Sequence, residues 1–369
     1  FFSKDGGGIG SIAVHPSKKY YAIAEKGAWP NIYIYEFPSL KLYRVLRKGT
    51  ERSYSNICFS QNGNSIASVG SSPDYLLCVW EWLQEVVILK SKAFSQEVYK
   101  VSFNRFNEHA LTTSGMGHIK FWKIAETFTG LKLQEIAKFG QIELSDVTAF
   151  VDFEDGKVLS TAEYGRLLLW EGNLIKSVIG IDAEVPCHNG AIEVLMFKDQ
   201  QIISAGVDGY IRFWDYPTIN QSESDEAFNF YMKPTKENTW NLAGIPAHIL
   251  SIVEHTNFWV VEDAKGKIWK FKIEDGSKEQ ILETNAGKFN DVAASPINNC
   301  VVTAGADGFV RLWDYGNKRQ FCARNFKTQS EATCIEWVPY NKRNSGRLLA
   351  VGFSDGIIRL VVINQNELT

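Results

Sequence analysis

Long apolar runs, paired cysteines and an excess of one charge are all missing from this 369-residue sequence. No apolar run approaches 18 residues, so no membrane-spanning helix is expected. Lysine and arginine number 39 against 42 aspartates and glutamates, which gives a net charge of -3. Such a balance provides no general attraction for nucleic acid or anionic lipid. We therefore expect neither a nucleic-acid partner nor a membrane partner.

The six cysteines are widely spread and never form a Cys-x-x-Cys pair. In a chain of this length the pattern predicts small buried hydrophobic side chains in a reducing, intracellular compartment, not a disulfide framework. Cys187 and His188 are adjacent, but no second Cys/His group lies at ligand spacing. The glycine-rich stretch Gly6-Gly7-Gly8 is followed by no predicted helix that could hold a phosphate. We expect no metal and no cofactor.

What the chain does contain is a repeated segment. GYIRFWDY at 209–216 recurs as GFVRLWDY at 308–315 and as GHIKFWKI at 117–124, with looser copies elsewhere. The residues that occupy the tryptophan position are Tyr35, Trp80, Trp122, Trp170, Trp214, Phe271, Trp313 and Val361. They are separated by 45, 42, 48, 44, 57, 42 and 48 residues. This period is typical of four-stranded propeller blades that carry the WD signature.

The turn residues favour the same fold. Asp-Gly pairs at 208–209, 307–308 and 355–356 stand between apolar runs, where they predict tight hairpins. We predict an all-β, WD-repeat β-propeller as a single domain over 1–369, with eight four-stranded blades or, alternatively, seven. The predicted blade cores span about 9–37, 53–82, 95–124, 145–172, 188–216, 247–273, 288–315 and 332–363.

Closure of the predicted ring depends on the two ends of the chain. The last repeat is followed by no segment that reads as an outer strand, because the chain stops at Thr369. Residues 1–4 precede the first repeat at the place where an outer strand would lie. We predict that this N-terminal segment completes the last blade and closes the ring, which would remove exposed sheet edges.

Three residues of one repeat could be mistaken for a hydrolase triad. The resemblance to WD repeats instead implies that His188, Ser204 and Asp208, with Trp214, form a hydrogen-bonded set inside one blade. A buried carboxylate must be satisfied by donors, whereas catalysis would need an exposed serine and an oxyanion hole. We therefore predict a structural role and no enzymatic activity.

The other repeats keep only part of this set. Thr303, Asp307 and Trp313 occupy the equivalent places of a later repeat, without the histidine. Met116 and Tyr164 replace the aspartate in two further repeats, which we expect to be held mainly by packing.

The longest interval between repeats offers a candidate partner loop. Between 215 and 247 it combines acidic residues with the aromatic residues Phe228, Phe230, Tyr231 and Trp240. Long loops on rigid scaffolds often carry binding residues. The alternative interpretation is a surface excursion that carries one outer strand.

Several segments are far more specific than the WD pattern. SPDYLLCVWEW at 72–82, TTSGMGHIKFW at 112–122 and TFTGLKLQ at 127–134 resemble the cilia- and flagella-associated protein 44 family, in its N-terminal WD-repeat region. The resemblance runs from about residue 39 to 363. It implies a scaffold of the axonemal tether/tether-head complex in a cilium or flagellum. Its partners would be other tether subunits, inner-arm dynein and doublet microtubules, and it would regulate beating. The alternative is a propeller that reads a peptide or modified residue as an adaptor in another cytoplasmic complex.

Overall fold

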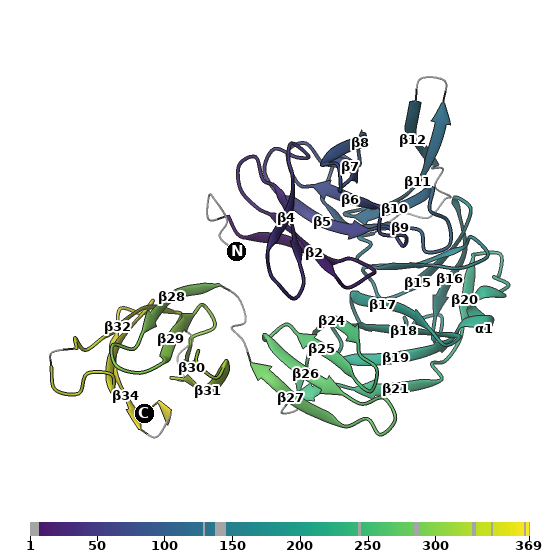
Figure 1. The fold of residues 1–369 in the computed structure, drawn as a ribbon. Helices are drawn as coiled ribbons and strands as arrows, with labels where there is room; N and C mark the ends of the chain where they lie inside the picture. Colours follow the sequence, from purple (N-terminus) through teal and green to yellow (C-terminus); the bar gives the residue numbers. More distant parts are fainter. Residues whose placement is uncertain are drawn as a thin grey trace. The chain divides into compact units, whose positions relative to one another are not determined.

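The computed structural model describes residues 7–127, 130–136, 145–242, 245–283, 288–326, 330–340, 342–364 and 367–368. Within these ranges the chain forms strands and one short helix, and no helix is long and apolar enough to cross a bilayer. The chain divides into two compact units, Phe1–Trp240 and Asn241–Thr369. The prediction of an all-β chain built from four-stranded antiparallel sheets is confirmed (Figure 1).

The first unit contains five sheets, each on one of the predicted repeats. The strands of the first three are β1 (Ile9–Val14), β2 (Tyr20–Glu25), β3 (Ile32–Glu36), β4 (Leu42–Leu46), β5 (Tyr54–Phe59), β6 (Ser65–Gly70), β7 (Leu76–Glu81), β8 (Val86–Lys92), β9 (Val98–Phe103), β10 (Ala110–Gly115), β11 (His118–Thr127) and β12 (Gly130–Ile136). The next two begin with β13 (Phe150–Asp152), β14 (Val158–Thr161), β15 (Leu167–Glu171), β16 (Leu174–Gly180), β17 (Ile192–Lys198), β18 (Gln201–Gly206) and β19 (Tyr210–Asp215). Within each of these sheets the strands named above pair antiparallel with their neighbours.

The long interval after β19 supplies strands to two different sheets. It starts with helix α1 (Tyr216–Asn220), whose N-terminus is capped by the Asp215 carboxylate. Strand β20 (Asn229–Tyr231) then pairs parallel with β16 of the fourth sheet. Strand β21 (Lys236–Thr239) pairs with β19 and completes the fifth sheet. The expected single outer strand is therefore β21, and β20 is an addition that the sequence analysis did not predict.

The second unit contains three four-stranded sheets and one short two-stranded ribbon. Its strands are β22 (Asn241–Leu242), β23 (Ile245–Pro246), β24 (Ile249–Glu254), β25 (Trp259–Asp263), β26 (Lys267–Phe271), β27 (Lys278–Glu283), β28 (Phe289–Ala294), β29 (Cys300–Gly305), β30 (Phe309–Asp314), β31 (Arg319–Asn325), β32 (Ala332–Trp337), β33 (Leu348–Phe353), β34 (Ile358–Asn364) and β35 (Glu367–Leu368).

The last of these sheets differs from expectation. We expected no outer strand after its third strand, and this was wrong, because β35 pairs with Ile363 and Asn364 of β34. Two residues near the chain end are enough to make this short ladder. Residues 1–4, predicted to complete the same sheet, lie outside the described residues, so their pairing stays a prediction.

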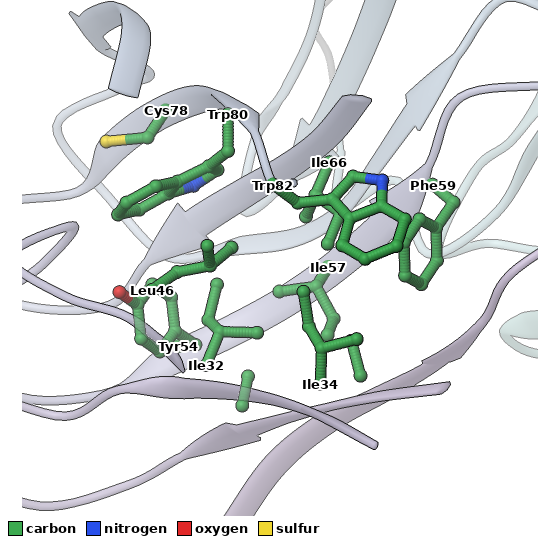
Figure 2. Packing of buried hydrophobic residues seen from close by; sticks show 12 residues of the cluster. Ile32, Ile34, Leu46, Tyr54, Ile57, Phe59, Ile66, Cys78, Trp80 and Trp82 are labelled. Atoms are coloured by element: carbon green, nitrogen blue, oxygen red, sulfur yellow. The ribbon is translucent and has the colours of Figure 1, made fainter. Parts of the chain in front are cut away.

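Within each unit, the described core clusters lie between neighbouring sheets. Ile32, Ile34 and Leu46 of the first sheet pack against Tyr54 and Trp80 of the second (Figure 2). Each fully buried side chain of this size contributes about 1.5–3 kcal/mol. A β-rich segment of this sequence thus buries its apolar face only when the neighbouring repeat is present.

A β-bulge in the first strand of several sheets aims a side chain at the next sheet. The register shifts just before Ser11 in β1, Asn56 in β5 and Asp291 in β28. Ser11 Oγ accepts a hydrogen bond from the Ile57 N–H at 3.2 Å. Asn56 Oδ1 accepts one from Val101 N–H at 3.0 Å, and Asp291 Oδ2 one from Ile335 N–H at 2.8 Å. Bulges re-aim side chains in this way, and here they link inner strands of successive sheets.

Candidate functional site

The structure brings His188, Ser204, Asp208 and Trp214 together inside the fifth sheet. His188 precedes β17, Ser204 lies on β18, Asp208 on the β18–β19 turn and Trp214 on β19. His188 Nδ1 lies 2.9 Å from Asp208 Oδ1, and His188 Nε2 lies 2.7 Å from Ser204 Oγ. Trp214 Nε1 donates to Ser204 Oγ at 2.8 Å. The four side chains therefore form one continuous hydrogen-bonded chain.

The proton positions in this chain follow from the donors and acceptors. The ionised Asp208 carboxylate can only accept, so the His188 Nδ1–H donates to it. In a neutral imidazole Nε2 is then an acceptor, so the Ser204 hydroxyl donates to it while accepting from Trp214 Nε1. The order Ser–His–Asp is that of a catalytic triad. However, Ser204 is 0% exposed and His188 is 1% exposed. A substrate carbonyl cannot reach the Ser204 oxygen in this arrangement, so the chain of hydrogen bonds acts inside the sheet.

The Asp208 carboxylate is the most heavily bonded member. Besides His188, it accepts hydrogen bonds from the N–H groups of Asn189 and Tyr210 and from Arg212 NH1 at 2.8 Å. Burial alone would raise the pKa of Asp208, but the hydrogen bonds from His188 and Arg212 outweigh burial and hold the pKa well below its usual range. The carboxylate thus stays ionised and ties the β18–β19 turn to the segment before β17.

Unlike the Asp208 carboxylate, the His188 imidazole is held in its neutral form. Burial lowers the pKa of His188 below its usual value, although its hydrogen bond to Asp208 opposes this. A neutral imidazole is also what the Ser204 hydroxyl requires as an acceptor. The set is therefore built around a neutral histidine at neutral pH.

An arginine that the sequence analysis missed accompanies the turn aspartate. Arg212 and Arg311 each lie four residues after the aspartate of an Asp-Gly turn and pair with it, at 2.8 Å and 2.9 Å. Arg359 pairs with Asp355 at 3.6 Å in the same register. The signal was present as Asp-Gly-x-x-Arg in three repeats of the sequence. Side chains at this spacing lie on the same face of the strand that follows the turn.

The second predicted set is joined differently. Trp313 Nε1 donates to Thr303 Oγ1 at 3.0 Å, and Asp307 Oδ2 pairs with Arg311 NH2 at 2.9 Å. The Trp-to-hydroxyl bond recurs at 2.8–3.0 Å in five sheets: Trp80–Ser68, Trp122–Thr113, Trp170–Ser160, Trp214–Ser204 and Trp313–Thr303. This recurrence within five separate sheets indicates a common structural device.

A turn without its own aspartate receives a carboxylate from elsewhere. At the Met116 turn the Gly117 N–H donates to Asp146 Oδ1, and Tyr99 Oη donates to Asp146 Oδ2, both at 3.0 Å. The expectation that this repeat is held mainly by packing is therefore incomplete. Asp146, from the segment before the fourth sheet, replaces the missing turn aspartate.

The four residues of the candidate partner loop do not share one surface. Trp240 is 1% exposed, and Phe230 is half-buried against the core of the fourth and fifth sheets. Phe228 and Tyr231 are exposed. A carboxylate, that of Asp225, accepts hydrogen bonds from the N–H groups of Ala227 and Asn229 and fixes the turn. Only the Phe228 and Tyr231 rings are free to meet a partner.

The remaining candidate reactive groups are metal-ligating side chains and cysteine thiols. No three His, Cys, Asp or Glu side chains of these residues come together as a metal site. Burial raises the pKa of the Cys187 thiol to about 12, which suppresses its reactivity. Only Cys78 and Cys187 are buried, whereas the other cysteines are partly buried or, at Cys334, exposed, so the expectation of six buried cysteines was wrong for four of them.

The carboxylate of Asp208 is expected to stabilise the fold. Asp208→Ala leaves buried donors of His188 and Arg212 unpaired and should lower the free energy of unfolding by about 1–3 kcal/mol. The control is Glu184→Ala at an exposed position, expected to change it by less than about 0.5 kcal/mol. Urea unfolding followed by circular dichroism measures both. Equal stabilities of Asp208→Ala and wild type would contradict the network.

The buried neutral histidine predicts a pH dependence. Because the folded pKa of His188 lies below its unfolded value of about 6.5, the unfolded chain gains a proton first as the pH falls. The stability from this group is fully present above pH of about 6.5 and decreases as the pH falls towards the folded pKa. His188→Gln should therefore show a shallower decrease between pH of about 7 and 5 than wild type, in urea unfolding. Parallel pH profiles would show that His188 does not set this slope.

Comparison with known proteins finds WD-repeat propellers. The family model "Echinoderm microtubule-associated protein first beta-propeller" matches residues 4–229, and that of the WD domain, G-beta repeat, matches residues 276–314. Cilia- and flagella-associated protein 44 of Mus musculus is 41% identical over 97% of this chain, and its counterpart in Chlamydomonas reinhardtii is 39% identical over 97%. The chain spans only 20% and 21% of the lengths of those two relatives.

A solved structure agrees on the fold alone. The crystal structure of the computationally designed Ika8 protein matches 97% of this chain and 96% of its own, with a TM-score of 0.52 and 19% identity. The resemblance to cilia- and flagella-associated protein 44 inferred from the sequence is confirmed. With its model match over residues 4–229, the chain belongs to the family of the echinoderm microtubule-associated protein first β-propeller, a family of WD-repeat propellers.

Proposed function

We propose that the chain is a non-catalytic scaffold of the ciliary or flagellar axoneme. In this role it helps to tether inner-arm dynein motor domains to doublet microtubules and so regulates ciliary beating. The observation that carries the proposal is the similarity to cilia- and flagella-associated protein 44 from three organisms, at 37–41% identity over 86–97% of this chain. The proposed partners are other tether subunits, inner-arm dynein and doublet microtubules.

The site geometry supports a role without catalysis. Among the described residues, the one Ser–His–Asp arrangement that resembles a triad is buried. Its serine accepts a hydrogen bond from the Trp214 indole N–H. Exposed aromatic side chains are instead held on a fixed turn at Phe228, next to β20. Aromatic residues are favoured at the centre of protein interfaces. We assign Phe228 and Tyr231 to a partner contact.

We further propose that the eight sheets close into one ring as blades, with residues 1–4 beside β34. The support is apolar surface at the two ends of the repeat array. Ile12 in β1 is 57% exposed and Leu360 in β34 is 70% exposed, whereas Ala13 and Val361 on the opposite faces pack into the cores of their own units. Exposed apolar faces of this kind need a covering partner. A seven-blade ring with one sheet outside it is the alternative.

Ring closure is tested by small-angle X-ray scattering of the purified chain. A compact chain of this length should have a radius of gyration of about 21 Å. Leu360→Glu, which places a charge on the proposed contact, should increase that value, whereas Leu42→Glu on the outer strand β4 should not. A wild-type radius clearly above that of a compact chain would contradict the closed ring.

The scaffold function is tested by a pull-down from ciliary extract with the tagged chain. We expect recovery of inner-arm dynein and other tether subunits. The double variant Phe228→Ala/Tyr231→Ala should reduce recovery at least about fivefold, and Leu40→Ala, at an exposed apolar residue on another turn, should not. Failure of the folded wild-type chain to recover these proteins would contradict the scaffold. Equal recovery by the double variant would contradict only the role of the loop.

A further inference from the structure

A tryptophan is held in an unfavourable, exposed position on the loop between β2 and β3. Trp29 is 70% exposed and has a φ of 52°, in the left-handed region that glycine favours. The loop is nevertheless fixed, because Gly27 N–H donates to Arg52 O at 2.7 Å and Trp29 N–H donates to Glu51 O at 2.8 Å. Strained residues that the surrounding structure holds in place often mark functional sites.

A pocket of about 360 Å³ lies against this tryptophan and opens to solvent. Trp29 and Leu76 give it apolar walls, and the exposed side chains of Lys48 and Lys90 stand at its edge. Lys48 also has a positive φ of 70°. We call Trp29, Leu76, Lys48 and Lys90 the Trp29 pocket.

Two lysines and two acidic residues, Glu51 and Asp74, line the Trp29 pocket. Neither Lys48 nor Lys90 forms an ion pair within the described part of the chain. The carboxylate of Asp74 lies in the same pocket, but its two oxygens accept hydrogen bonds from Thr50 Oγ1 at 2.8 Å and Glu51 N–H at 3.0 Å. The Asp74 carboxylate therefore stabilises the loop and does not pair with either lysine.

The same loop has a second cationic side. A neighbouring pocket of about 420 Å³ is lined by Lys26 and Arg52, which also lack ion pairs among the described residues. Four cations, against the two acidic residues Glu51 and Asp74, thus surround a loop that presents one large aromatic ring, so positive charge is in excess there. A ligand that spans the loop would meet positive charge on both sides of the indole.

We propose that the Trp29 pocket binds an acidic peptide segment of a partner protein that carries an aromatic or large apolar side chain. That side chain packs on Trp29 and Leu76, while flanking carboxylates pair with Lys48 and Lys90. A nucleic-acid backbone would require a longer basic track, and the chain as a whole has a net charge of -3. The inference rests on the proposed scaffold function, because it names the chemistry of one partner of that scaffold.

The test measures fluorescence anisotropy of a labelled acidic peptide in which a phenylalanine is flanked by glutamates, with the purified chain. We expect binding that weakens with salt, and at least about tenfold weaker binding when alanine replaces that phenylalanine. Trp29→Gly should weaken binding by a similar factor while leaving Tm unchanged or higher, since glycine accommodates the positive φ. The variant Lys48→Glu/Lys90→Glu should weaken binding at least about tenfold and reduce its salt dependence.

Matched controls come from the opposite turn of the same sheet. Leu40 is 61% exposed with a φ of 58°, so Leu40→Gly makes the same change away from the pocket and should keep the affinity. Lys18→Glu/Lys41→Glu repeats the charge reversal at exposed lysines.

Several results would overturn the inference. They are no binding of the peptide by the wild-type chain, undiminished binding by Trp29→Gly, or a lowered Tm of Trp29→Gly, which would make Trp29 a packing residue. Tighter binding of a single-stranded oligonucleotide than of the peptide would assign the pocket to nucleic acid. If the wild-type chain recovers dynein from extract but does not bind the peptide, this inference is contradicted and the scaffold function is not.

Discussion

Burial of one sheet against the next is the constraint on which the rest of this structure depends. A single four-stranded sheet with apolar side chains on both faces would expose both faces to water, and neighbouring sheets are the surfaces that cover them. The core between the first two sheets illustrates this, since Leu46 and Ile34 of one meet Trp80 and Tyr54 of the other (Figure 2). The repeat period in the sequence follows from this need, because each unit must present the same kind of face to its neighbour.

Close packing of the sheets then decides what the polar side chains can do. A serine, a histidine and an aspartate stand in the order of a triad, but Ser204 lies where Trp214 donates to it and no solvent reaches it. Buried polar groups are tolerated when each has a partner, and this set satisfies a carboxylate that fixes a turn. The same carboxylate role is taken by Asp146 at the Met116 turn, from a different segment of the chain. The turn therefore needs the charge, while its position in the sequence can vary.

Local signals in the sequence were enough to locate the sheets, but the sequence did not predict contacts between distant segments. The Asp-Gly turns and the spacing of tryptophans depend on neighbouring residues, so they predicted the hairpins and the Trp214–Ser204 contact. The parallel pairing of β20 with β16 joins segments far apart in sequence, and no periodicity announces it. Trp240 stands in a polar stretch that suggested exposure, yet its N–H bonds to Gly209 O beside β19 and its ring is buried. Arg212 could have been found, because its spacing from Asp208 repeats.

The crossing of β20 onto the fourth sheet has a mechanical consequence. After β19 of the fifth sheet, the chain forms β20, which hydrogen-bonds to the outer strand β16 of the fourth sheet. It then forms β21, which pairs with β19 and completes the fifth sheet. The two sheets are thus joined by backbone hydrogen bonds as well as by side-chain packing. A pull on the segment between these sheets must break the β16–β20 and β19–β21 hydrogen bonds before the segment can extend. This link lets the two sheets bear tension together.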